Sequence, residues 1–141
     1  MVAVKSHKYG ALNPFAHLQK EVSLEEAMKS VPICQPLNLY DCCLISDGAA
    51  GVVMASEERA RMISDTPVWI TGLGSASDTM MISERPTLVG LTASRVAGEQ
   101  AYKMAGVSPS DLDVACTQDW FSIAEIMSYE DLGFCKKGEG G

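Results

Sequence analysis

The sequence has no apolar run long enough to cross a lipid bilayer, and its first residues contain no hydrophobic secretory segment. A membrane-spanning helix needs about 20 predominantly apolar residues, and a signal peptide carries its own apolar stretch behind a basic start. We therefore expect a protein without a membrane span and with a cytoplasmic location.

Positive charge is also scarce. The 141 residues include 11 Lys and Arg against 18 Asp and Glu, for a net charge of -7, and no basic stripe stands out. Binding to a phosphate backbone needs a cationic surface. We therefore expect no nucleic-acid partner.

The five cysteines form no Cys-x-x-Cys pair, and no histidine lies near them at the spacing of metal ligands. Cys42 and Cys43 are adjacent, and a disulfide between neighbours in sequence would be strained. This pattern predicts reduced, mostly buried thiols of the cytosolic kind and no metal site.

The composition is that of a globular protein of one domain's length, with 47% apolar and 21% charged residues. Two capping signals predict short helices. Ser23 and Glu26 can form a capping box that opens a helix to about Ser30. Ser56 can cap another helix, whose first turn carries two glutamates suited to the helix dipole.

Two longer helices are expected in the second half of the chain. The clearest covers residues 91–105, with Thr92 as its cap and Gly106 as its stop. A second capping box, Ser122 with Glu125, opens a helix to about residue 132. We expect an irregular segment with one short helix at residues 1–20. We expect a loop at residues 75–90 and a loose tail at residues 136–141.

Three segments have the composition of strands: residues 52–54, 68–74 and 113–119. The first is expected to be buried, and the second ends in glycines. Strands that alternate with helices indicate the α/β class. So few strands predict a piece of a larger sheet rather than a complete one.

Several residues have a possible functional role, and each also has a simpler structural explanation. Gly72 and Gly74 match the first two glycines of a dinucleotide fingerprint, but such glycines more often end a strand. His7 and His17 favour a surface or packing role, because a catalytic histidine needs a partner that the sequence does not reveal. Cys43 favours a buried structural thiol, because a nucleophilic cysteine needs a basic neighbour or a helix N-terminus.

The segment Gln118-Asp-Trp-Phe121 lies where a predicted strand gives way to a helix. Ligands of α/β sheets bind at this end of the strands. Gln118 can donate and accept hydrogen bonds, and the two aromatic side chains offer an apolar wall. Asp119 is equally well explained as a helix cap, so a binding site and a structural role both stay open.

Four blocks follow one another in a fixed order along the chain: residues 4–14, 39–50, 84–86 and 118–125. With residues 126–138, they resemble the thiolase superfamily. Within it, they are most similar to the archaeal and bacterial acetyl-CoA acetyltransferase branch, which includes the sterol-carrier and lipid-transfer-protein thiolases. The resemblance covers nearly the whole chain.

The resemblance implies part of a five-layered αβαβα fold built from two similar halves. Residues 1–65 would be the end of the N-terminal half (a loop segment, a strand and a helix), and residues 66–141 the start of the C-terminal half. It further implies a dimer or tetramer that transfers acyl groups between coenzyme A thioesters by Claisen chemistry. Acyl-CoA would be the substrate, and no cofactor would be covalently bound.

The resemblance also implies that central catalytic groups lie elsewhere. The family's nucleophilic cysteine precedes this region, and its Gly-His-Pro segment and second catalytic cysteine follow it. None of the five cysteines here matches either one. The chain is therefore expected to be a fragment or a degenerate relative, inactive as an acyltransferase when isolated.

Four site residues carry over by position. Thiolases have Asn-Glu-Ala-Phe, and this branch often has His-Asp-Cys-Phe, where this chain has Gln118-Asp-Trp-Phe121. The resemblance thus implies an oxyanion-hole role for Gln118, an acyl pocket reshaped by the large Trp120, and a pantetheine-tunnel role for Phe121. Cys43 falls where the family usually has a serine near the pantetheine arm.

Two alternatives stay open from the sequence. The missing nucleophile is compatible with a non-catalytic thiolase-like or lipid-transfer-protein subunit that acts in a complex, including an aldolase for steroid-like CoA esters. Apart from any family, Gly72 and Gly74 are compatible with a small nucleotide-binding α/β domain.

Overall fold

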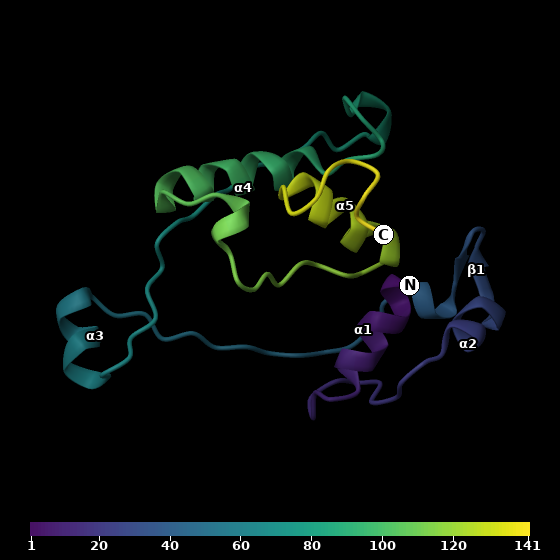
Figure 1. Ribbon diagram of the computed structural model, residues 1–141, viewed down its shortest axis with the longest axis horizontal. Coiled ribbons are helices and arrows are strands. Elements are labelled where there is room, and N and C mark those ends of the chain that lie inside the picture. Colours follow the sequence, from purple (N-terminus) through teal and green to yellow (C-terminus); the bar gives the residue numbers. More distant parts are fainter.

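Helices make up most of the regular structure, and long extended segments join them (Figure 1). The computed structural model describes all 141 residues. The elements are α1 (Val2–Gly10), α2 (Leu24–Lys29), β1 (Pro32–Cys34), β2 (Leu37–Asn38), α3 (Glu57–Ile63), α4 (Thr92–Ala105) and α5 (Ser122–Asp131), with single 3-10 turns η1 (Leu39–Asp41), η2 (Ile82–Glu84) and η3 (Pro109–Asp111).

The two short helices with predicted caps form as expected. The Glu26 N–H donates to Ser23 Oγ at 3.2 Å, and the Ser23 N–H donates to the Glu26 carboxylate at 2.9 Å, which completes the capping box of α2. Ser56 accepts from the Arg59 N–H at the start of α3. Residues 1–20 contain the one short helix expected there, α1, and are otherwise irregular.

The predicted caps of α4 and α5 are wrong, although both helices are present. Thr92 is already the first helical residue of α4, and neither helix has a side-chain cap at its N-cap residue. Ser122 Oγ donates instead to Asp41 Oδ1 at 2.9 Å, and Glu125 turns toward α1. Partners distant in sequence therefore compete successfully with the local capping box. Gly106, at φ 70°, ends α4 as predicted.

None of the three predicted strands forms a sheet. The only sheet is an antiparallel pair, β1 with β2, in which Pro32 faces Asn38 and Cys34 faces Leu37. Residues 52–54 were expected to be buried, yet Val53 is 95% exposed. A strand needs another strand to pair its backbone N–H and C=O groups, and no strand pairs with these segments.

The chain buries little. Eight of 141 residues are buried, among them Val2, Ala3, Val22 and Ala124, so most large apolar side chains are exposed. Most of the buried residues belong to α1, α4 and α5, and α5 contacts both of the other helices. Figure 1 shows α5 between α1 and α4. Tyr102 of α4 donates its hydroxyl to the Leu132 carbonyl at 2.9 Å, which ties the last two helices together.

The C-terminal tail is held rather than loose. The N–H groups of Gly138 and Gly140 donate to Glu130 at 3.0 and 3.3 Å. Lys137 Nζ lies 2.9 Å from Asp131 and donates to the Val89 carbonyl at 3.0 Å. The expectation of a free tail was wrong because its polar groups find partners on α5. Residues 75–90 form a loop as expected, apart from η2.

Gly72 and Gly74 lie directly against α4. A Cβ atom at Gly72 would fall 2.3 Å from the Ala101 carbonyl oxygen, and one at Gly74 would fall 1.8 Å from that of Ala97. The absence of a side chain therefore allows this segment to reach the helix backbone. The glycines are explained by this contact, which removes the motive for a nucleotide site. No helix of the chain has the length and apolar character that a membrane span requires.

Candidate functional site

Two segments far apart in sequence meet beside the N-terminus of α5. Cys42 forms an isolated antiparallel bridge with Phe121, and the Cys43 N–H donates to the Trp120 carbonyl at 2.8 Å. The Ser122 hydroxyl adds a third link through its hydrogen bond to Asp41. The structure therefore brings together three of the residues singled out from the sequence: Cys43, Trp120 and Phe121.

The predicted site side chains are accessible. Trp120 is 47% exposed and Phe121 41% exposed. Cys43 is exposed, which contradicts the expectation of a buried thiol. Gln118 is also exposed and precedes the paired residues. Of the four residues, only Cys43 lines the adjacent cleft. Each of the four side chains is therefore accessible to solvent.

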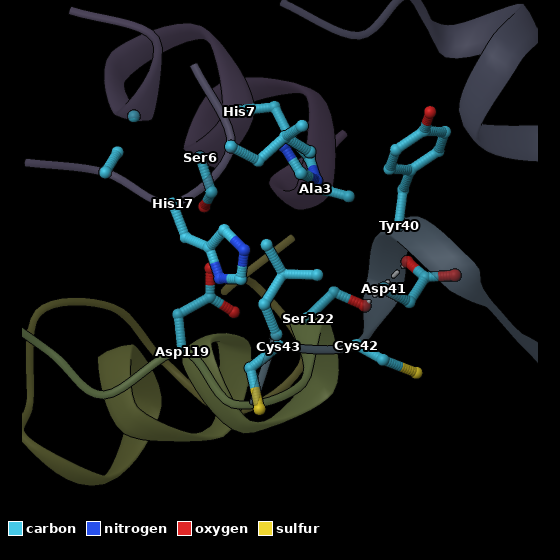
Figure 2. Close-up of a pocket in the computed structure, with 14 residues that line it drawn as sticks. Ala3, Ser6, His7, His17, Tyr40, Asp41, Cys42, Cys43, Asp119 and Ser122 are labelled. Carbon is cyan, nitrogen blue, oxygen red and sulfur yellow. Dashed lines mark hydrogen bonds between the residues drawn. The ribbon is translucent and has the colours of Figure 1, made fainter. Parts of the chain in front are cut away.

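A cleft of about 330 Å³ lies beside this pairing (Figure 2). Helix α1, residues 16–18, residues 40–44 and the start of α5 form its walls. Both histidines line it. His7 packs edge-on against Tyr40, with ring centroids 5.1 Å apart, and His17 Nδ1 lies 2.6 Å from Ser46 Oγ. The packing role expected for His7 agrees with this geometry, whereas the cleft itself was not predicted.

Two of the thiols, Cys42 and Cys135, have raised pKa values. All five cysteines are free, and three of them are exposed rather than buried as expected. Burial raises the pKa of the Cys42 thiol, and the nearby Asp41 carboxylate raises it further. A raised pKa keeps the sulfur protonated, whereas a nucleophilic cysteine requires the thiolate. No group of three or more His, Cys, Asp or Glu side chains is arranged to hold a metal ion.

A polar cluster missed by the sequence analysis lies beneath the site. Glu125 is 5% exposed and receives hydrogen bonds from Lys5, Ser6 and Tyr129. Asp119 is an exposed residue of the cleft wall, and partial desolvation raises the pKa of its carboxyl group, with a further rise from the charge of Glu125. The local sequence predicted that Glu125 forms a capping box with Ser122. No other feature of the sequence indicated that Glu125 binds residues of α1.

The chain is similar in sequence and fold to known proteins. Residues 74–141 match the family described as thiolase C-terminal domain-like. The whole chain is 40% identical to the acetyl-CoA acetyltransferase of Methanothermobacter thermautotrophicus and spans 37% of that protein. It is 38% identical to sterol carrier protein 2 of Oryctolagus cuniculus, over 97% of this chain and 26% of that protein.

A solved structure, titled Ltp2-ChsH2(DUF35) aldolase, matches 99% of this chain and 38% of its own chain. The TM-score is 0.83 and the sequence identity is 34%. This likeness confirms the α/β class and the thiolase-like fold predicted from the sequence. The chain belongs to the thiolase superfamily, among the relatives of acetyl-CoA acetyltransferases and sterol carrier protein 2.

Proposed function

We propose that this chain contributes the pantetheine side and an oxyanion-hole donor to the acyl-CoA site of a thiolase-type acyltransferase. The observation that carries the proposal is the pairing of Cys42 and Cys43 with Trp120 and Phe121. It joins the two segments to which the thiolase resemblance assigns substrate contacts. A single stretch of 141 residues therefore presents both segments on one accessible surface.

Each residue has a distinct role in this proposal. Attack on a thioester places negative charge on its carbonyl oxygen, and the Gln118 amide would donate a hydrogen bond to that oxygen. Phe121 offers an apolar surface to the pantetheine arm, and the Cys43 thiol is a weak donor beside it. Trp120 would narrow the space for the acyl group. The nucleophile and the catalytic histidine would come from outside these residues.

The proposal includes a division of the chain into two parts. Residues 1–65 would end the N-terminal thiolase half, and residues 66–141 would begin the C-terminal half. The match of residues 74–141 to a C-terminal family supports this division. The cytoplasmic location, the coenzyme A thioester substrate, and the dimer, tetramer or mixed complex expected from the resemblance belong to the same proposal.

Substitution of Gln118 tests the oxyanion role in the full gene product. We expect Gln118→Ala to lower kcat for acyl transfer by about 100- to 1,000-fold, the usual effect of removing one oxyanion donor, with KM little changed. Gln35→Ala, at an exposed glutamine in the β1–β2 turn, is the matched control and should leave both constants unchanged. Equal rates for Gln118→Ala and the unsubstituted protein would contradict the role.

A second function is supported by the raised pKa of a cysteine and by the similarity of the chain to an aldolase. Burial and the Asp41 carboxylate raise the pKa of the Cys42 thiol, and the chain is similar to a protein titled as an aldolase. An aldol cleavage needs proton transfer rather than a thiolate nucleophile. We therefore propose, as the alternative, a thiolase-like subunit that acts in a complex on CoA esters. Retro-aldol cleavage of a CoA ester by the full gene product in complex with a partner subunit would support it, whereas acyl transfer that depends on Gln118 would exclude it.

A further inference from the structure

Asp41 joins the two segments of the candidate site through its side chain. Its Oδ1 atom accepts a hydrogen bond from the Ser122 hydroxyl at 2.9 Å, and its Oδ2 atom accepts one from the Asn38 N–H at 3.0 Å. Figure 2 shows the first of these bonds as a dashed line. Asp41 and Ser122 are 81 residues apart in sequence, and both are half-buried. One carboxylate therefore closes the η1 turn and also holds the start of α5.

The negative charge of Asp41 suits this place in the fold. Ser122 is the first residue of α5, and the N-cap residue, Phe121, makes no side-chain hydrogen bond to the helix. A carboxylate near the N-terminus of a helix is stabilised by the helix dipole. A hydrogen bond to a charged group also contributes more than one between neutral groups. We therefore expect the Asp41–Ser122 pair to be a strong link between η1 and α5.

The residues that follow Asp41 pair directly with those that precede α5. Cys42 forms a bridge with Phe121, and the Cys43 N–H donates to the Trp120 carbonyl at 2.8 Å. In pairing of this kind, a slip of one residue turns every side chain to the opposite face. So few backbone contacts specify the register weakly, and the side-chain link beside them fixes it.

We propose that Asp41 and Ser122 are positioning residues that set Cys43 and Phe121 in place for the pantetheine arm of an acyl-CoA. Both act through the backbone register of the segments that they join, and neither is assigned a contact with the reacting thioester. The inference rests on the proposed acyl-CoA site. It adds that binding of the CoA ester, rather than the chemical step, depends on this hydrogen bond.

Removal of the Ser122 hydroxyl tests the pair in the full gene product, without any CoA ester. Alanine has the highest helix propensity, so Ser122→Ala should leave α5 intact. We expect hydrogen–deuterium exchange of the Cys43 amide, isolated by overlapping peptides in mass spectrometry, to become about tenfold faster, because one hydrogen bond to a charged group is lost. Ser122→Thr keeps a hydroxyl and should exchange at the original rate. The control Ser83→Ala, at an exposed serine of η2, should do the same.

A double-mutant cycle separates the action of this pair from a general loss of stability. Asp41→Ala alone should accelerate exchange of the Cys43 amide, because it removes the acceptor of the Ser122 hydroxyl. Ser122→Ala should then add nothing in the Asp41→Ala protein, since its partner is already absent. An unchanged exchange rate in Ser122→Ala, or an equal acceleration by Ser122→Ala with and without the Asp41 carboxylate, would overturn the inference.

The kinetics of acyl transfer distinguish failure of this inference from failure of the proposed function. Ser122→Ala should raise KM for the CoA ester several-fold and leave kcat nearly unchanged, as loss of binding alone does, whereas Gln118→Ala should act on kcat. If amide exchange responded as expected while KM stayed the same, the substrate contacts proposed for Cys43 and Phe121 would fail. The role of Asp41 and Ser122 in fixing the two segments would then stand.

Discussion

At Gly74 the chain approaches α4 so closely that no side chain fits. A Cβ atom there would lie 1.8 Å from the Ala97 carbonyl oxygen, which belongs to the helix backbone and cannot rotate away. We expect Gly74→Ala to lower the free energy of unfolding of the full gene product by about 1–3 kcal/mol, as overpacking does. Urea denaturation measures this difference.

Gly51 provides the matched control, because nothing lies within 4 Å of a Cβ atom there. Gly51→Ala should therefore have little effect on stability. If Gly74→Ala and Gly51→Ala changed the free energy of unfolding equally, the close contact with α4 would be wrong. The same contact occurs at Gly72, where an added Cβ atom would fall 2.3 Å from the Ala101 carbonyl oxygen. Both glycines are therefore required by the close approach to α4.

At the scale of an element, α4 depends on a residue of α5 for its first turn. The Leu91 N–H donates to Asp131 Oδ2 at 2.6 Å, and Lys137 lies 2.9 Å from the other carboxylate oxygen. Asp131 therefore supplies from α5 the carboxylate that the local N-cap lacks. We expect Asp131→Ala to destabilise the protein by about 1 kcal/mol, the usual effect of losing a cap, as measured by urea denaturation.

Asp113→Ala removes an exposed carboxylate from an irregular segment and is the control for Asp131→Ala. Its effect on stability should be small. Asp131→Asn retains an acceptor oxygen and should lose less stability than Asp131→Ala. The remote cap would be refuted if Asp131→Ala and Asp113→Ala were equally stable.

The capping box of α2 predicts a pH dependence. The Ser23 N–H and then Lys20 hold the pKa of Glu26 at about 2, below its ordinary value of 4.5. A lowered pKa means that the carboxylate supports α2 above pH 4.5, and that this support is lost as pH falls toward 2. A carboxyl NMR titration of Glu26 should show the low midpoint, and Lys20→Met should raise it. A midpoint at 4.5 in both proteins would refute the capping box.

Local signals account for what could be predicted among the elements. Ser23, Ser56 and Gly106 act within a few residues of their own helices, so the sequence suffices to place them. Ser122 and Glu125 had the same local pattern, but Asp41 and Lys5 bind them instead. The predictions of strands were wrong for a related reason. Residues 52–54 have strand composition, but a strand forms only beside a second strand, which the local sequence does not specify.

At the scale of the whole molecule, the candidate site forms from contacts between distant segments. The resemblance to thiolases named Cys43, Trp120 and Phe121 one by one, and the structure shows that Cys43 pairs with Trp120. The cluster of Lys5 and Glu125 could not be predicted in this way, because its partners lie 120 residues apart and the local motif of Glu125 indicated a capping box instead. The sequence also does not reveal that the Glu125 side chain is buried, with 7% of its surface exposed.

The exposed apolar segments predict how the isolated 141-residue chain behaves. Val53 and Val68 are each 95% exposed, within extended stretches that have strand composition but no pairing partner. Unpaired edges and uncovered apolar surface promote association, so we expect this chain, expressed alone, to form concentration-dependent oligomers in light scattering. The double substitution Val53→Lys and Val68→Lys should reduce the association, because charge on a free strand opposes edge pairing. Met104→Lys, at an exposed helical position, should not. A chain that stays monomeric across the concentration range would show that these segments cover one another in solution.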